Sequence, residues 1–337
     1  MNPALSVVMP AFNEAGKIAG TLAELRAALV GVPGGYEVLV SDDGSTDATA
    51  AEVEKAVASD PRVRLVRNPH RGRGGALKSG LAAAAGEIVV TIDADLSYGP
   101  GDALRLLEHL RKYPGCDLVI GSCYMPGGRV EGVPAKRLWV SKVGNLLLRF
   151  AFDGRFYTTT GILRGYRRER IQALLRNPGL VSDGKELYLE FLHKALAAGW
   201  SVEEVPATLT WRRGPSDGSF SFLPTAISHL GFLCFERRAI LLPASVALQI
   251  PLFAWVFVRW SEDRRLALSV WGSCLALACL GQAVFWMTGR GQARWSRWIT
   301  SQNFPFPIFL LAMMVSLGGF ALLGLAGLRF LSAVFIR

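Results

Sequence analysis

The chain has 337 residues, of which 51% are hydrophobic, and its mean hydropathy of +0.30 is high for a purely water-soluble protein. Its formal net charge is +10, and residues 239–337 supply +6 of this charge through eight arginines and two acids. A basic excess concentrated in the last third favours contact with anionic lipid and argues against a nucleic-acid partner. The five cysteines are dispersed without a CxxC pair, which argues against a zinc ribbon and fits a reducing cytosol.

The first 122 residues alternate between apolar stretches and Ala/Leu-rich stretches. Strands are predicted at residues 5–10, 36–41, 62–67, 87–92 and 116–122, with a helix between each consecutive pair. This alternation predicts an α/β fold with a mostly parallel, doubly wound, Rossmann-like sheet. The opening MNPALSVVMP leads directly into the first strand, so we expect no signal peptide.

Acidic residues follow three of the predicted strands, at Glu14, at the pair Asp42–Asp43, and at Asp93 with Asp95. The carboxyl ends of parallel strands meet at one edge of a sheet, where the ligands of such folds bind. Two common nucleotide motifs are absent. The turn PAFNEAGK lacks the GxGxxG fingerprint, and RGRGGALKS has Leu77 where a P-loop needs glycine. The acidic turns therefore predict a nucleotide site built on carboxylates.

Asp93 and Asp95 are the candidate metal ligands. Two carboxylates this close repel each other and raise each other's pKa unless a cation lies between them. Mg²⁺ and Mn²⁺ take carboxylate and phosphate oxygens and keep several waters, so two protein ligands are sufficient. The structural alternative is an ordinary polar turn. Because two other acidic turns lie at the same edge, we favour a divalent cation that bridges these carboxylates to a diphosphate.

The C-terminal third carries three long uncharged stretches, at residues 239–258, 266–287 and 305–328. Each is long enough to cross a bilayer core of ~30 Å, so we expect residues 239–337 to form a multi-pass membrane domain. Residues 220–238 have near-helical apolar spacing and end in two arginines, which predicts an amphipathic interfacial helix. By the positive-inside rule, the domain at residues 1–219 should be cytoplasmic.

The motifs SVVMPAFNEAGKI, VSDDGSTD, GALKSG and DAD occur in an order and spacing that resembles the inverting family 2 glycosyltransferases of the GT-A fold. The segments VIGSCYMPGGRVEGVPAKRLWVSKVGNLL and EEVPATLTWRRGPS are similar to those of polyprenyl-phosphate sugar transferases, which include the dolichol-phosphate mannose synthases. The resemblance covers roughly residues 5–216. It implies a metal-dependent membrane enzyme that moves a hexose from a GDP- or UDP-sugar to a polyprenyl phosphate, dolichol or undecaprenyl phosphate, at the cytoplasmic face. A homo-oligomer formed through the membrane helices is compatible with it.

The resemblance also implies residue roles. The donor nucleotide would be bound by Pro10, Ala11, Phe12, Glu14, Asp42, Asp43, Lys78, Asp93 and Ala94. The metal would be bound by Asp93 and Asp95, with Asp95 facing the diphosphate. The catalytic positions would be Asp95, Arg137, Ser141, Arg212 and Arg213. The acceptor phosphate would be bound by Arg129, Lys136, Arg137 and Ser141. Arg137 and Ser141 stand four residues apart, which places both on one face of a helix.

A phosphate acceptor has a definite chemical requirement. The second pKa of a phosphate monoester is about 6, so the group is largely dianionic at neutral pH and needs no general base. It needs positioning cations instead, and arginine suits phosphate best through its planar fork.

The chain departs from the family pattern at several positions. Cys123 stands where relatives commonly have arginine, and Ser97 stands where they have glutamine. In WRRGPSD the arginine is shifted by one position and Asp217 replaces a lysine. Glu190 matches a family acidic position, but a structural role is the more economical interpretation.

Two other functions remain open. One is transfer to a lipid hydroxyl or a polysaccharide, for which Asp183 in SDGKE could supply the base, although the Gln-x-x-Arg-Trp motif of such enzymes is absent. The other is a non-catalytic membrane scaffold that retains the nucleotide-sugar fold, and the complete DxD and donor turns argue against it.

Overall fold

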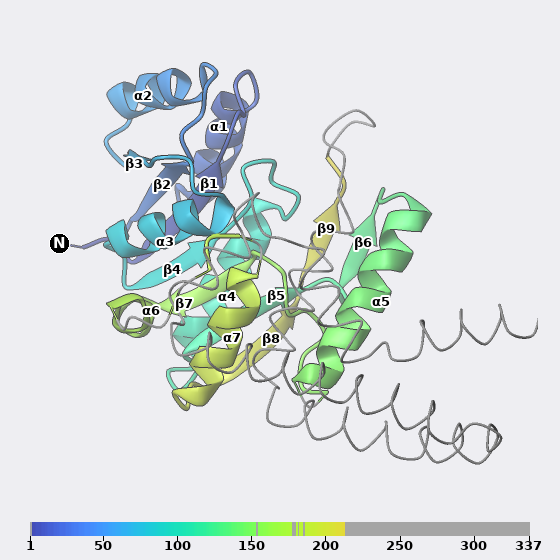
Figure 1. The fold of residues 1–337 in the computed structure, drawn as a ribbon. Helices are drawn as coiled ribbons and strands as arrows, with labels where there is room; N and C mark the ends of the chain where they lie inside the picture. The colour runs from blue at the N-terminus through green and yellow to red at the C-terminus, as the bar shows by residue number, and fades with distance from the viewer. Residues whose placement is uncertain (1, 153, 177–179, 181, 185, 213–337) are drawn as a thin grey trace, which may run out of the picture. The chain divides into compact units, whose positions relative to one another are not determined.

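The computed structural model describes residues 2–152, 154–176, 180, 182–184 and 186–212 (Figure 1). The chain divides into two units, Met1–Phe232 and Leu233–Arg337, and the described residues lie in the first. In chain order the elements are β1 (Leu5–Ala11), α1 (Ile18–Leu29), β2 (Tyr36–Asp42), α2 (Thr49–Ser59), β3 (Val63–Arg67), α3 (Arg73–Ala83), β4 (Ile88–Thr91), α4 (Pro100–Lys112), β5 (Leu118–Ser122), β6 (Arg129–Glu131), α5 (Ala135–Ala151), β7 (Arg164–Arg167), α6 (Arg168–Arg176), α7 (Leu187–Ala197), β8 (Val202–Pro206) and β9 (Thr208–Thr210).

The central sheet has the strand order β3-β2-β1-β4-β7-β5-β8. The five strands predicted in the first 122 residues all form, and β1 pairs in parallel with both β2 and β4. The expected α/β fold with a mostly parallel sheet is therefore confirmed. The exception is β7, which pairs antiparallel with β4 on one side and β5 on the other. Its sequence, RGYR, has no apolar run, so the pattern of the chain gave no signal for it.

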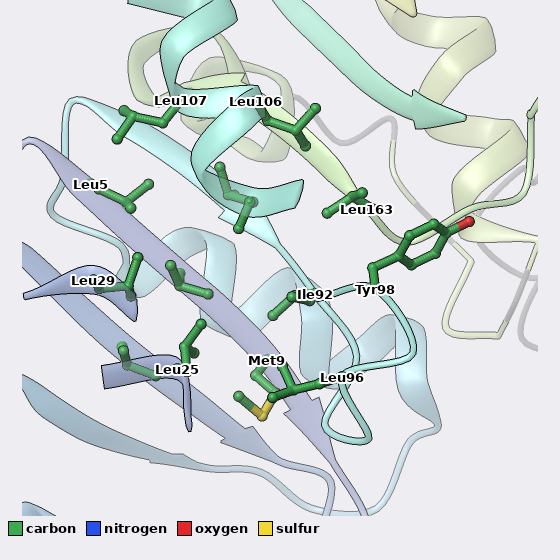
Figure 2. Packing of buried hydrophobic residues seen from close by; sticks show 14 of the residues in the cluster. Leu5, Met9, Leu25, Leu29, Ile92, Leu96, Tyr98, Leu106, Leu107 and Leu163 are labelled. Atoms are coloured by element: carbon green, nitrogen blue, oxygen red, sulfur yellow. The ribbon is translucent and has the colours of Figure 1, made fainter. Parts of the chain in front are cut away.

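Helices cover both faces of the sheet around β1, which explains why all seven residues of this strand and of β2 are buried. On one face, Leu25 and Leu29 of α1 and Leu106 of α4 pack with Leu5 and Met9 in a single apolar cluster (Figure 2). Burying a leucine in such a cluster contributes about 2 kcal/mol.

Helix α3 covers the other face and lies very close to it. A Cβ atom added at Gly80 would lie 2.5 Å from Cγ1 of Val8 and 3.2 Å from Cβ of Ser41. The hydroxyl of Ser41 also donates a 2.6 Å hydrogen bond to the carbonyl oxygen of Ala76. Only glycine at position 80 permits this close approach of the helix to the sheet. The approach fixes the position of α3, including its first residues.

A second, two-stranded sheet lies beside the segment that contains Asp93 and Asp95, and its strand β9 is hydrogen-bonded to that segment. It consists of β6 and β9 in parallel, and α5 follows β6. Tyr98 forms an isolated β-bridge with Leu209, and the amide of Thr210 donates a 2.8 Å hydrogen bond to the carbonyl oxygen of Ser97. Residues 208–212 are therefore held beside the loop that follows β4.

No helix among residues 2–212, where the structure describes them, is both long and apolar enough to span a membrane. The predicted interfacial helix at 220–238 and the predicted spans at 239–258, 266–287 and 305–328 lie outside the described residues.

Candidate donor, metal and acceptor site

The segment from Asp93 to Tyr98 alternates between half-buried and buried residues. Asp93, Asp95 and Ser97 are half-buried, whereas Ala94, Leu96 and Tyr98 are buried in the core. The hydroxyl of Thr21 on α1 fixes the segment by donating a 2.8 Å hydrogen bond to the carbonyl oxygen of Ala94. The loop therefore directs the three polar side chains away from the core, at the carboxyl end of β4.

The two carboxylates fit a hard divalent cation. One oxygen of Asp95 accepts hydrogen bonds from the amide of Ser97 at 2.9 Å and from its hydroxyl at 2.7 Å. Ser97, which replaces the glutamine of relatives, thus orients Asp95. Outer hydrogen bonds of this kind hold metal ligands in position. The residues present are therefore compatible with the predicted Mg²⁺ or Mn²⁺.

A second group of possible ligands, His109, Cys116 and Glu203, has atoms within 4.8 Å of one another. It lies elsewhere, because Cys116 precedes β5 whereas Asp93 follows β4, and these two strands run in the same direction. Nε2 of His109 already lies 2.8 Å from the Glu203 carboxylate, and burial raises the pKa of the Cys116 thiol to about 11. This group is not part of the nucleotide site.

The loops that follow β1 and β2 are hydrogen-bonded to each other. The amide of Asn13 donates to the hydroxyl of Ser45 at 3.0 Å, and the amide of Thr46 donates to the side-chain oxygen of Asn13 at 2.9 Å. The amide of Glu14, a predicted donor ligand, bonds the hydroxyl of Thr49 at 2.7 Å. The structure thus brings the first two predicted donor turns together.

Asp42 and Asp43 are almost fully buried, and their carboxylates accept hydrogen bonds from nearby backbone amides. Asp42 accepts from the amide of Ser45, and Asp43 accepts from the amides of Arg71 and Gly72 at 3.0 and 3.1 Å. Both carboxylates therefore shape the donor loops, whatever they contribute to a ligand.

An aromatic pair lies at the rim of these loops. The ring of Phe12 is 42% exposed and stacks on His70, with centroids 4.5 Å apart and an interplanar angle of 25°. His70 also lies 3.0 Å from the Asp43 carboxylate. Phe12 was predicted as a nucleotide contact, and Pro10 and Ala11 lie directly before it in β1. His70 was not predicted, because the four histidines look scattered in the sequence.

Helix α3 begins beside the site and is tied to the segment at 182–184. The amides of Gly74 and Gly75 donate to the carbonyl oxygen of Asp183 at 2.8 and 3.2 Å. Lys78, a predicted donor ligand, forms a 2.6 Å ion pair with the carboxylate of Asp183. The residue considered as a possible base is therefore paired with a cation.

Arg73 is the residue that the sequence interpretation missed most clearly. Its guanidinium forms an ion pair with the carboxylate of Asp93, one of the two candidate metal ligands. The segment RGRGG fails the P-loop pattern, and that pattern gives no role to its arginines. The informative signal was two arginines among glycines directly before a helix.

The predicted acceptor residues converge from α5 and from the segment after β9. The guanidinium of Arg137 lies over the ring of Trp211, with Cζ 4.3 Å from the centroid. The hydroxyl of Tyr124 donates a 2.7 Å hydrogen bond to the hydroxyl oxygen of Ser141. Arg137 and Ser141 both lie on α5, as predicted.

Arg212 is engaged with an acidic partner in this structure. It forms two hydrogen bonds to Glu24, of 2.9 and 3.0 Å, and these bonds raise the pKa of Arg212. The charge of Asp95 raises it further, which places Arg212 within electrostatic reach of the paired aspartates. Arg129 is exposed on β6. The side chain of Lys136 and the whole of Arg213 lie outside the described residues.

Cys123, which departs from the family pattern, and Glu190, which matches it, both have structural roles. The thiol of Cys123 is buried and accepts a 3.6 Å hydrogen bond from the hydroxyl of Tyr98, so this position offers no cation to a phosphate. Glu190 is buried, accepts a 2.8 Å bond from the amide of Ser182 and pairs with Lys194 at 2.7 Å. These contacts support the structural role inferred for Glu190.

The mixed sheet, with carboxylates at the strand ends and a second small sheet beside them, defines a glycosyltransferase of the GT-A fold. The sequence matches the family described as glycosyl transferase family 2 over residues 6–175. The chain belongs to glycosyl transferase family 2.

Relatives with assigned activities are similar over the same region. The chain is 33% identical over 211 residues to polyprenol monophosphomannose synthase of Mycolicibacterium smegmatis, covering 61% of this chain and 77% of that protein. It is 32% identical over 209 residues to undecaprenyl-phosphate mannosyltransferase of Micrococcus luteus, covering 61% and 83%. A crystal structure of glucosyl-3-phosphoglycerate synthase from Mycobacterium tuberculosis with Mn²⁺, UDP-glucose and phosphoglyceric acid has a TM-score of 0.50 and 25% identity, covering 69% and 80%.

Proposed function

We propose that this glycosyltransferase moves a hexose from a GDP- or UDP-sugar to the phosphate of a polyprenyl phosphate lipid, with inversion at the anomeric carbon. Mannose is the first sugar to test, because the relatives from M. smegmatis and M. luteus are named for transfer of mannose. The nucleotide would lie across the joined loops after β1 and β2, with its base near the exposed ring of Phe12.

The observation that carries the proposal is the arrangement of basic residues beside the paired aspartates. The amide of Thr210 is hydrogen-bonded to the carbonyl oxygen of Ser97, two residues after Asp95. Residues 211 and 212 are therefore held near the candidate metal ligands. The guanidinium of Arg137 lies over the ring of Trp211, and the negative charge of Asp95 raises the pKa of Arg212. A phosphate held by these arginines would therefore be close to the reacting sugar.

The chain's own residues would act mainly by positioning the acceptor. A phosphate monoester carries most of its charge at neutral pH and can attack without a general base. The guanidinium of Arg137 would orient it through paired hydrogen bonds. The hydroxyl oxygen of Ser141 accepts a hydrogen bond from the Tyr124 hydroxyl. The O–H group of Ser141 can therefore donate a hydrogen bond to a phosphate oxygen.

Asp93 and Asp95 would hold the divalent cation, which when bound supplies neutralisation of the charge on the departing nucleoside diphosphate. Ser97 keeps one oxygen of Asp95 in a fixed direction. In this arrangement the nucleoside diphosphate would leave on the side of the donor loops, and the acceptor phosphate would attack from the side of α5.

The proposal extends to location. A lipid phosphate lies at headgroup level, so the catalytic unit must be held at a membrane surface. We propose that residues 220–238 lie on that surface, that residues 239–337 anchor the protein by several crossings, and that residues 1–219 face the cytoplasm. The arginines at positions 237 and 238, directly before the first uncharged stretch, support this orientation.

The test is transfer of radiolabelled sugar by the purified full chain into undecaprenyl phosphate, with a panel of GDP- and UDP-sugars. Label should enter a mild-acid-labile lipid with Mn²⁺ and not with EDTA, and D95N should be inactive under both conditions. Label in an acid-stable glycolipid would instead support transfer to a hydroxyl. The 2.6 Å ion pair between Asp183 and Lys78 argues against that alternative, because it already engages the carboxylate that would serve as the base.

A further inference from the structure

The ion pair between Arg73 and Asp93 is not explained by folding requirements alone. Arg73 is the first residue of α3, at the positive end of the helix dipole. A cation at this end of a helix is unfavourable, typically by a few tenths of a kcal/mol up to about 1 kcal/mol. The side chain is one-third exposed, so the position does not need arginine to fill the core. Its placement therefore points to the carboxylate that it contacts.

Arg73 also lies near a buried hydroxyl. Burial raises the pKa of Tyr188, and the nearby charges of Arg73 and Arg164 oppose that rise. Tyr188 lies on α7, so the guanidinium of Arg73 is situated between that helix and the loop after β4. Two neighbours define its position, and one of them is a candidate metal ligand.

The charges at this point explain what the pair does. Asp93 and Asp95 repel each other when no cation is bound. The guanidinium of Arg73 supplies a positive charge to Asp93 from within the chain. A divalent cation that binds Asp93 must displace this guanidinium or share the carboxylate with it. A displaced guanidinium would remain close to Asp93 and could then bind the negative charge of a nucleoside diphosphate.

We propose that Arg73 acts as an internal cation for Asp93 in the ligand-free enzyme and becomes a diphosphate ligand when metal and nucleotide bind. It is a positioning residue in this scheme. It suppresses binding of metal alone and favours binding of metal together with nucleotide. The inference rests on the proposed donor site, and it makes no use of the lipid acceptor.

The experiment measures Mn²⁺ affinity by electron paramagnetic resonance and GDP and UDP affinity by calorimetry, on the full chain in detergent. In R73Q, Mn²⁺ should bind about two- to fivefold more tightly without nucleotide, because a partly exposed ion pair no longer competes. In the same variant, GDP or UDP should bind about tenfold more weakly with Mn²⁺ present, because a charge-assisted hydrogen bond is lost.

Two further variants make the result specific. R71Q changes an exposed arginine two residues earlier and should leave both affinities within twofold of the wild type. R73K retains a cation and should restore both affinities most of the way. If R73Q binds Mn²⁺ equally or more weakly without nucleotide, or if R73K behaves as R73Q does, Arg73 has a structural role and the inference is wrong.

These readouts are separate from sugar transfer. If no sugar reaches polyprenyl phosphate but R73Q shifts the two affinities in opposite directions, the proposed acceptor is wrong and the inference stands. If transfer occurs and the affinities do not shift, the acceptor assignment stands and the inference fails.

Discussion

The guanidinium of Arg137 lies over the indole ring of Trp211, with Cζ 4.3 Å from the ring centroid. This contact joins α5 to the segment after β9, which the amide of Trp211 fixes by donating a 2.9 Å hydrogen bond to the carbonyl oxygen of Glu131. A cation–π contact of this kind contributes about 0.5–1 kcal/mol at a partly exposed site. It holds the arginine in one orientation without neutralising its charge.

Replacing Arg137 should therefore affect the acceptor and spare the donor. We expect R137A to lower kcat/KM for polyprenyl phosphate by about tenfold to 100-fold, because a charge-assisted contact worth about 1.5–3 kcal/mol is lost. GDP and UDP affinities should stay within twofold. K142Q, at an exposed position of the same helix, is the matched control and should have normal kinetics. A donor-binding defect in R137A would contradict the assignment.

Ser97 provides a sharper test of the metal site than the aspartates themselves. Its amide and hydroxyl both bond one oxygen of Asp95. We expect S97A to weaken Mn²⁺ binding by about tenfold, the usual cost of removing a partner of a metal ligand, while D95N abolishes binding. S59A, at the exposed end of α2, should bind Mn²⁺ normally. Equal affinities for S97A and the wild type would show that Asp95 is oriented by other groups.

Asp60 predicts how stability depends on acid. The hydrogen bonds of Arg62 lower the pKa of Asp60 to about 2, from an ordinary value of 3.8. Because the folded-state pKa is depressed, the stabilisation is complete above about pH 4 and is lost as the pH falls toward 2. Arg62 is 45% exposed, so we discount the effect for solvent screening and expect D60N to lower the free energy of unfolding by about 1 kcal/mol at pH 7.

The control for this measurement is E54Q. Glu54 pairs with Arg67, but both side chains are more than half exposed. Such surface pairs contribute little, so E54Q should change thermal unfolding by less than D60N at pH 7. Circular dichroism melts between pH 2 and pH 7 test the comparison. A difference between D60N and the wild type that persists unchanged at pH 2 would rule out the electrostatic explanation.

Two helical glycines should respond oppositely to alanine. At Gly80 the new methyl group would meet Val8 at 2.5 Å, so G80A should cost about 1–3 kcal/mol of stability through overpacking. At Gly101 in α4 nothing lies within 4 Å, and G101A should raise stability by about 0.5–1 kcal/mol, because alanine loses less backbone entropy in a helix. Thermal melts of the two variants test this, and stabilisation by G80A would contradict the packing of α3 on β1.

The parts of the fold that could be predicted were those with a regular pattern. Strands β1, β2 and β4 each contain three consecutive apolar residues (VVM, VLV and IVV), and such buried runs are distinctive in a sequence. The acidic turns followed from the strands, since parallel strands bring their carboxyl ends together. For that reason the sequence could predict that the donor loops meet and that Asp93 and Asp95 lie at the same edge of the sheet.

Strand β7 could not be predicted in this way, because tertiary structure overrides its composition. It begins at Arg164, which is completely buried, although arginine is normally exposed. The guanidinium is satisfied by the carbonyl oxygens of Thr159, Gly161 and Tyr188, at 2.6–3.0 Å. Thr159 and Gly161 lie just before Arg164 in the chain, whereas Tyr188 comes from α7, and no periodic pattern in the sequence indicates that the three carbonyl groups will surround a buried guanidinium. The same limitation hid the pairing of Arg73 with Asp93.

The position of β7 in the sheet also determines the order in which parts of the fold can form during synthesis of the chain. Because β7 lies between β4 and β5, residues 118–122 cannot join the central sheet until residues 164–167 have left the ribosome. The loops after β1 and β2 lie entirely within the first 52 residues and can close early. Residues 208–212, which bring Arg212 toward the paired aspartates, are the last of the described residues to be synthesised. A nascent chain can thus acquire its nucleotide loops well before it has a site in which an acceptor could be used, so catalytic competence begins only when synthesis of the catalytic unit is nearly finished.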